Sequence, residues 1–201
     1  GTPGLLALLA AVVAATLLAV GTTVRMAGVH GPTGVGLVAA AAIGTSLQVM
    51  TVRPQLFSVV LLAALLLSLF AAVRWRPALA AVPFLFALWA NLHGGWLVGL
   101  GVLGLWAVAA AWRRAVTSWQ AMAVVVGSLA ATLLNPYGAG LVALLLDTVR
   151  AGRADIEEWQ PLWEQPLQLL PWALSVAVLV YGVAKLKREW WRTLPAIALA
   201  L

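Results

Sequence analysis

The feature that most constrains this chain is the recurrence of long apolar runs with very few charged residues between them. Seven such runs, each 15 to 20 residues long, cover residues 5–24, 35–50, 56–73, 78–92, 96–112, 120–134 and 169–184, and another begins at residue 193. Each approaches the roughly 20 residues that a helix needs to cross a bilayer. Only 9% of the residues are charged, against about 25% in a soluble domain. The sequence therefore predicts an all-α, polytopic transmembrane helix bundle of about seven spans plus a partial one.

We expect residues 1–201 to form a single transmembrane helical domain, and to be an internal fragment of a longer protein. Residue 1 is Gly rather than Met, and the last apolar run stops in mid-helix. Turns are predicted at residues 31–34 and 135–138, where Gly, Pro and Asn gather. Within the domain, residues 139–168 are expected to form an extracytoplasmic interfacial helix and an acidic loop. Pro83 is expected either to kink its helix or to mark a late start.

The orientation follows from the distribution of Lys and Arg between alternate loops. Three basic residues, Arg53, Arg150 and Arg153, fall in one set of loops together with most of the acidic residues. The other nine fall in the second set, namely Arg25, Arg74, Arg76, Arg113, Arg114, Lys185, Lys187, Arg188 and Arg192. The second set is therefore predicted to be cytoplasmic. The net charge of +6 is explained by this orientation, so we expect membrane lipid rather than nucleic acid as the partner.

A short polar segment between two apolar runs, Asn91 to Gly95, is expected at the extracytoplasmic surface. Trp89 and Trp96 flank it, and both rings suit the headgroup level, where the indole N–H stays in contact with water. Asn91 and His93 need partners beside hydrocarbon, so they either cap the two helices or line a binding site. The glycines at positions 95 and 99 have the spacing of a close-packing helix face.

Two other groups on the same side are candidates for a site. Arg53 either reaches lipid phosphate at the membrane surface or binds a phosphate of a lipid-linked ligand, whose oxygens a guanidinium matches. Glu158 and Trp159 belong to an acidic stretch that either is a solvated loop or supplies a base beside an aromatic platform for a sugar. The sequence contains no Cys, which excludes a thiolate site. With two well-separated His residues we predict no metal site and no cofactor.

Four blocks together resemble bacterial polytopic proteins related to the GT-C glycosyltransferases, the class that includes the dolichyl-phosphate-mannose protein mannosyltransferases. The blocks are VRPQLFSVVLLAALLLSL, LWANLHGGWLVGLGVLGLW, LLNPYGAGLV and IEEWQPL, in this order between about residues 50 and 165. The resemblance implies a site that takes a sugar from a polyprenyl-phosphate donor. It implies that Arg53 binds the donor phosphate, that Asn91 and His93 line the carrier or sugar site, and that Glu158 and Trp159 border the acceptor entrance.

The resemblance also implies that the catalytic acid lies in a first outward loop, upstream of this chain. We therefore expect a glycosyltransferase-like protein in a bacterial inner membrane, using a lipid-linked sugar as substrate and an extracytoplasmic acceptor. Two alternatives come from other functional classes: a transporter or flippase for an amphiphile, and a non-catalytic membrane assembly subunit.

Overall fold

The structure is a computed structural model, and it describes residues 1–49, 53–150 and 173. The regular elements of this part are all helical, which confirms the all-α prediction there. They are α1 (Thr2–Met26), α2 (Gly31–Val49), α3 (Gln55–Ala72), the 3-10 helix η1 (Arg76–Ala80), α4 (Ala81–Leu92), α5 (Trp96–Trp112), α6 (Ser118–Ala131) and α7 (Gly140–Arg150). The acidic loop predicted to follow α7, the run at 169–184 and the final run lie outside the described residues.

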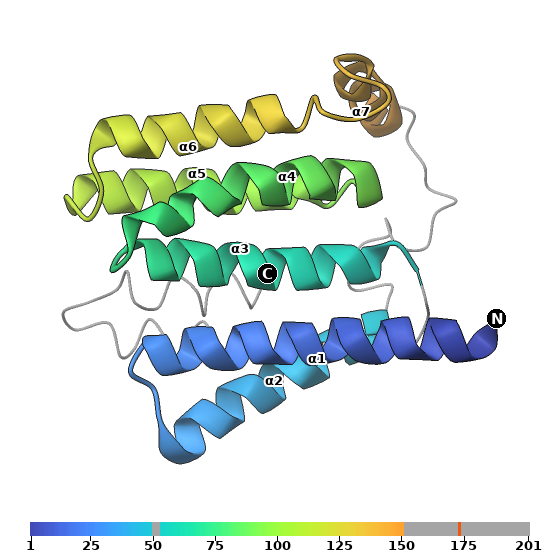
Figure 1. The fold of residues 1–201 in the computed structure, drawn as a ribbon, viewed down its shortest axis with the longest axis vertical. Helices are drawn as coiled ribbons and strands as arrows, with labels where there is room; N and C mark the ends of the chain where they lie inside the picture. Colours follow the sequence, from blue (N-terminus) through green and yellow to red (C-terminus); the bar gives the residue numbers. More distant parts are fainter. Residues whose placement is uncertain (50–52, 151–172, 174–201) are drawn as a thin grey trace.

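The helices α1 and α3 to α6 run back and forth along nearly one direction, and α2 is inclined to them (Figure 1). Helix α1 packs on α2 and α3, α3 packs on α4 and α5, and α6 packs on α4 and α5. This order brings the α1–α2, α3–η1 and α5–α6 turns to one end of the bundle, which we call the arginine end. The turn between α4 and α5 and the segment between α6 and α7 lie at the opposite end. Helix α7 is seen nearly end-on in the same view, so it lies across the bundle.

Two of the described helices, α1 and α3, are long and apolar enough to cross a membrane. The shorter apolar helices span residues 76–92, 96–112 and 118–131. At 1.5 Å per residue, a 17-residue helix is about 25 Å long, slightly less than the roughly 30 Å thickness of a hydrocarbon core. The number of spans therefore stays a prediction, whereas the helical runs themselves match the apolar segments of the sequence closely.

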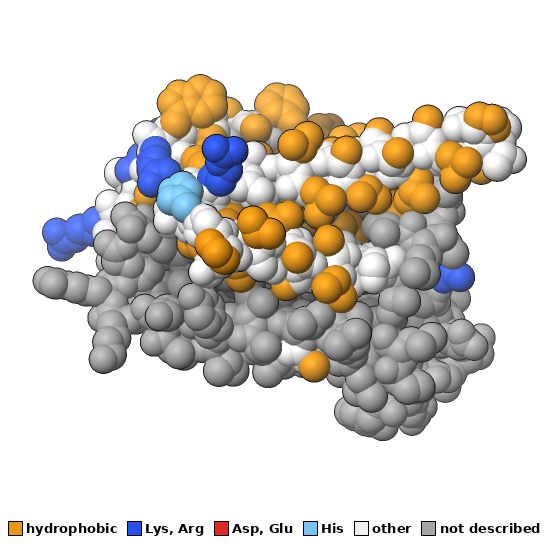
Figure 2. All heavy atoms as spheres, turned by 90° about the horizontal axis from the view of Figure 1, so that it is seen from below, with side chains coloured by type: hydrophobic (Ala, Val, Ile, Leu, Met, Phe, Trp, Pro, Cys, Tyr) orange, Lys and Arg blue, Asp and Glu red, His pale blue; other side chains and the backbone are white. Residues whose placement is uncertain are grey.

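The outer surface of the bundle is apolar. Phe84, Leu105 and Met122 are all exposed, although each lies within a helix. Figure 2 shows hydrophobic side chains along one face of the molecule, with most of its basic side chains gathered at one end. Many exposed apolar side chains along one face are typical of a protein that meets lipid or another protein.

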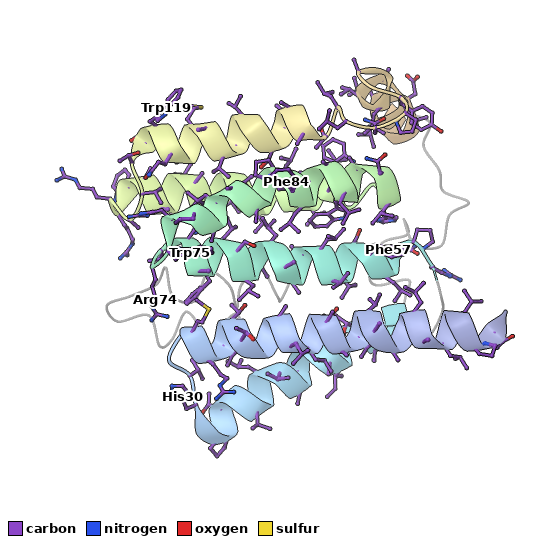
Figure 3. The ribbon with its side chains drawn as sticks, in the orientation of Figure 1. His30, Phe57, Arg74, Trp75, Phe84 and Trp119 are labelled. Atoms are coloured by element: carbon purple, nitrogen blue, oxygen red, sulfur yellow. The ribbon has the colours of Figure 1, made fainter. Side chains whose placement is uncertain are left out.

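Exposed tryptophans surround the arginine end. Trp75, Trp112 and Trp119 are 63%, 83% and 76% exposed, and Figure 3 shows Trp75 and Trp119 at this end together with Arg74 and His30. Arg74 also donates to the carbonyl of Met26 (2.8 Å) and so ties the end of α3 to the end of α1. Exposed Trp residues together with Arg are typical of a membrane–water interface.

The structure corrects the predicted start of one helix, α2, and decides between the two predictions for Pro83 in α4. The predicted turn at residues 31–34 is wrong, because these residues form the first turn of α2 and the chain reverses at residues 27–30 instead. Pro32 suits this place, since the N–H that proline lacks has no partner in the first turn of a helix. Pro83 lies in the first turn of α4, which begins at Ala81 after η1, so the proline marks a late start.

The core lies between α3, α4, α5 and α6. It contains Leu65, Phe86, Trp89, Trp96 and Leu103, all nearly or fully buried. Two glycines make this packing possible, namely Gly95 directly before α5 and Gly99 within it. A Cβ atom at position 99 would lie 2.5 Å from Cζ3 of Trp89, and one at position 95 would overlap the Ser58 hydroxyl. The predicted close-packing face is therefore confirmed, and its partners are side chains of α3 and α4.

Candidate functional site

Three polar side chains meet where the α4–α5 turn packs against the beginning of α3. The indole Nε1 of Trp89 donates to Oγ of Ser58 (2.8 Å), and Oγ of Ser58 lies 2.7 Å from Nδ1 of His93. The backbone N–H of Gly95 also donates to Nδ1 of His93 (3.1 Å). We call Ser58, Trp89, His93 and Gly95 the polar relay. It joins α3, α4 and the start of α5 through groups that would otherwise lack partners in apolar surroundings.

The relay determines which nitrogen of His93 carries a proton. An indole N–H and a backbone N–H can only donate. Because Nδ1 of His93 accepts from the N–H of Gly95, it holds no proton that it could give to Ser58, so the O–H of Ser58 donates to Nδ1. Nδ1 therefore accepts two hydrogen bonds, from Ser58 and Gly95, and carries no proton. The neutral ring then bears its proton on Nε2, a donor without a partner among the described residues.

Burial lowers the pKa of His93, in the turn between α4 and α5, below its usual value of 6.5. The cause is desolvation, which disfavours the charged ring. Protonation would also place a proton on Nδ1 against the N–H of Gly95. The electrostatics and the hydrogen bonds of the relay thus both favour neutral His93 at pH 7.

This lowered pKa predicts a loss of stability in acid. Because the folded state binds a proton less readily than the unfolded state, the stabilisation is complete above about pH 6.5 and declines as the pH falls from there towards the folded pKa. We expect the thermal midpoint of the wild-type protein in detergent to fall between pH 7.5 and pH 5. The His93→Asn variant, which cannot titrate there, should fall less. Equal losses in both proteins would contradict the prediction.

A cavity of about 290 Å³ adjoins the relay. Its walls come from α1, α2, α3 and the α4–α5 turn, and include the apolar side chains of Leu17, Val59, Leu62 and Val98. Gln55, Ser58 and His93 form one polar region, and Thr16 and Thr45 contribute hydroxyl groups. A volume near 300 Å³ is at the lower end of the range for small-molecule sites. The cavity can therefore accept part of a larger, mostly apolar molecule.

The residues that the sequence suggested for one site have different surroundings in the structure. His93 lines the cavity, and it also caps the start of α5 through Gly95. Asn91 is exposed, and its side-chain amide donates to the carbonyls of Ala87 and Leu134 (both 2.7 Å). It thereby links the end of α4 to the segment after α6. Arg53 is exposed and lies just before α3. Glu158 and Trp159 lie outside the described residues.

The expectation that Trp89 keeps its indole N–H in contact with water is wrong, and both Trp89 and Trp96 are buried within the bundle. Their exposed fractions are 1% and 3%, and the N–H of Trp89 bonds to Ser58 rather than to water. The physical reason is the small size of Gly95 and Gly99, which lets the α4–α5 turn settle onto α3 with the rings inside. Exposed tryptophans are found instead at the arginine end.

Sequence reasoning missed Ser58. A serine in an apolar helix is a weak signal, and α3 contains two of them. Ser68 donates to the carbonyl of Ala64 in its own helix (2.8 Å), which is the common arrangement for serine in apolar helices. Ser58 differs in having Trp89 and His93 opposite it, and these neighbours are 31 and 35 residues away in the chain.

The site offers hydrogen-bonding groups rather than a metal centre in the part described. Within residues 1–49 and 53–150, no group of three or more His, Asp and Glu side chains lies close enough together to hold a metal ion. Comparison with protein-family models, with curated proteins and with solved structures found no match. The chemistry of the cavity is therefore the main guide to function.

Proposed function

We propose that this chain forms the carrier-binding part of a glycosyltransferase-like protein of the bacterial inner membrane, which transfers a sugar from a polyprenyl-phosphate-linked donor to an extracytoplasmic acceptor. The observation that carries the proposal is the cavity beside the polar relay. It combines apolar walls, such as Leu62 and Val98, with a polar region formed by Gln55, Ser58 and His93. A lipid-linked sugar has the matching division into a hydrocarbon chain and a polar head.

The surface of the bundle supports a membrane location and an orientation. Helices α1 and α3 have the length and composition of membrane spans. Trp75, Trp112 and Trp119 are exposed at the arginine end, and loops rich in Arg are typical of the cytoplasmic side. The α4–α5 turn, with His93, lies at the opposite end of the bundle (Figure 1), which we assign to the extracytoplasmic side.

The proton acceptor of the transfer reaction is assigned to a carboxylate outside the described residues. Asp147 of α7 is the one acidic residue in residues 1–49 and 53–150, and it does not line the cavity. Deprotonation of an acceptor hydroxyl requires a base within hydrogen-bond reach. The described part therefore binds and orients the carrier.

Filling the cavity tests the proposal. Leu62 lines it, whereas Leu105 is 66% exposed on the outside of α5. In vesicles that contain the full-length protein and a polyprenyl phosphate linked to a radiolabelled hexose, Leu62→Trp is expected to lower transfer to an added acceptor at least about tenfold, since the larger ring occupies the carrier's place. Leu105→Trp should transfer as wild type does.

The thermal midpoint of each variant separates loss of binding from loss of fold. Wild-type transfer by a folded Leu62→Trp variant would contradict the proposal. Arg53→Ala should also reduce transfer without changing expression, because a phosphate ligand would be lost; unchanged transfer would remove Arg53 from the site.

A transporter or flippase for an amphiphile is the second candidate. The specific observation in its favour is the absence of any carboxylate from the described lining of the cavity. The same vesicles distinguish the two functions. Movement of the labelled lipid across the bilayer without a covalent product would favour the transporter, and a labelled acceptor would favour the transferase.

A further inference from the structure

Arginine side chains gather at the arginine end without any acidic neighbour among the described residues. The turns there contain Arg25, Arg74, Arg76, Arg113 and Arg114. The one acidic residue within residues 1–49 and 53–150 is Asp147, which belongs to α7 at the opposite end. None of these arginines is among the described residues that line the cavity. The arginine end is therefore a positively charged surface separate from the proposed carrier site.

Contacts between the three turns make this end one surface. Arg74 donates to the carbonyl of Met26 (2.8 Å), which ties the α3–η1 turn to the α1–α2 turn. Leu79 of η1 packs against the small cluster that contains Ala110 and Val116, at the α5–α6 turn. The α3–η1 turn is thus held against both of the other turns, so the arginines of the three turns share one end of the bundle.

Arg114 has a backbone conformation that is unusual for an arginine. Its φ is 55°, and it is the only residue other than glycine with a positive φ in the described part of the chain. It follows the end of α5, where the N–H of Ala115 donates to the carbonyl of Ala110 (2.8 Å) and the N–H of Arg114 to that of Ala111 (2.9 Å). This pair of bonds defines a helix end at which glycine is the usual residue, because a Cβ is strained there.

Helix α1 ends in the same way at the same end of the bundle, but with glycine. Gly28 has a φ of 77°. The N–H of Val29 donates to the carbonyl of Val24 (3.2 Å), and that of Gly28 to the carbonyl of Arg25 (3.0 Å). Glycine would therefore satisfy the backbone at position 114 as well. The arginine there costs the fold free energy, and such strain indicates a role for the side chain.

The side chain of Arg114 points to a role outside the fold. It is exposed and has no partner among the described residues. Trp112, two positions before it, is 83% exposed, and Trp75 beside Arg76 is 63% exposed. Tryptophan rings favour the headgroup level of a membrane, which brings neighbouring guanidinium groups close to lipid phosphates. A guanidinium matches phosphate oxygens with two parallel hydrogen bonds.

From these observations we infer that the arginine end binds the headgroups of anionic phospholipids, and that Arg114 is a ligand for their phosphate. The charge of the surface favours an anionic lipid over a zwitterionic one, whose own cation would meet the arginines. The inference goes beyond the proposed function and does not rest on it, because the carrier site lies at the opposite end of the bundle.

Two short-chain lipids with different headgroups test the inference. Phosphatidylglycerol or phosphatidylcholine is added to the full-length protein in a neutral detergent, and the affinity is obtained from the rise in thermal midpoint with lipid concentration. The wild-type protein is expected to prefer phosphatidylglycerol, and this preference should shrink as salt is added. Arg114→Gly should weaken phosphatidylglycerol binding about fivefold, as for the loss of one basic residue near a membrane surface, and leave phosphatidylcholine binding unchanged.

The sign of the stability change separates a ligand from a structural residue. Without added lipid, the thermal midpoint of Arg114→Gly is expected to equal or exceed that of the wild-type protein, because glycine adopts a positive φ without strain. A residue present only to stabilise the end of α5 would give a lower midpoint instead. Arg114→Lys keeps the charge and should retain most of the affinity. Arg76→Gln removes a second exposed guanidinium of the same surface and should weaken phosphatidylglycerol about as much as Arg114→Gly does.

Four results would overturn the inference. They are equal affinity of the wild-type protein for the two lipids, phosphatidylglycerol binding that neither Arg114→Gly nor Arg76→Gln weakens, a lowered midpoint of Arg114→Gly without lipid, and stabilisation by glycerol 3-phosphate as large as by phosphatidylglycerol. The last result would indicate a soluble phosphate ligand rather than a lipid surface. Each of them would leave the proposed function standing, since transfer from the lipid-linked donor is measured separately.

Discussion

Replacing Gly99 by alanine is expected to lower the free energy of unfolding by about 2 kcal/mol, within the range for overpacked cores. The added Cβ would lie 2.5 Å from Cζ3 and 3.0 Å from Cη2 of Trp89, and 3.3 Å from Cε1 of Phe86. Trp89 and Phe86 are both almost completely buried, so neither ring can move without displacing others. The clash should exceed the gain of up to about 1 kcal/mol that alanine brings to a helix.

Gly101 provides the matched control, because it lies in the same helix and a Cβ there would meet nothing within 4 Å. Gly101→Ala should therefore be neutral or slightly stabilising. Both variants are compared with the wild-type protein by denaturant titration in a mild detergent. Equal stability of the two variants would show that α5 does not pack closely on Trp89.

Replacing Trp89 by alanine is expected to have the largest effect of any single change, a loss of about 3 kcal/mol. This value is the lower end of the range for large aromatic residues. Trp89 is 1% exposed, packs within the main core and lines the cavity. Its loss also removes the donor to Ser58. We expect lower stability together with weaker transfer from the lipid-linked donor.

Two comparisons divide this effect into its parts. Trp89→Phe keeps an aromatic ring but removes the N–H, so the change in stability should be about 1–2 kcal/mol, as for one buried hydrogen bond. Trp119→Ala removes a ring that is 76% exposed at the arginine end and should change stability by less than about 0.5 kcal/mol. A Trp119→Ala loss as large as that of Trp89→Ala would contradict the assignment of the core.

Contacts with residues far away in the sequence decide which side chains of the segment 91–95 belong to the site. Asn91 and His93 are two positions apart, yet Asn91 bonds to Leu134 after α6 while His93 bonds to Ser58 in α3. Their spacing of two residues does not indicate that the two side chains bond to different parts of the bundle. The end of α4 explains it, because His93 leaves the helix in an extended conformation whereas Asn91 is still helical.

The sequence by itself determined the helical class, the approximate helix ends, and the alternation that places Arg25, Arg74 and Arg113 at one end of the bundle. These features follow from composition, because long apolar runs form helices whose backbone groups bond to one another and leave the charged residues to the turns. Only the tertiary structure decided that Trp89 and Trp96 are buried and that Ser58 meets His93 beside a cavity. The physical reason is that helices such as α3 and α5 are apolar on every side, so their sequences contain no contrast between faces that would indicate which side packs inward.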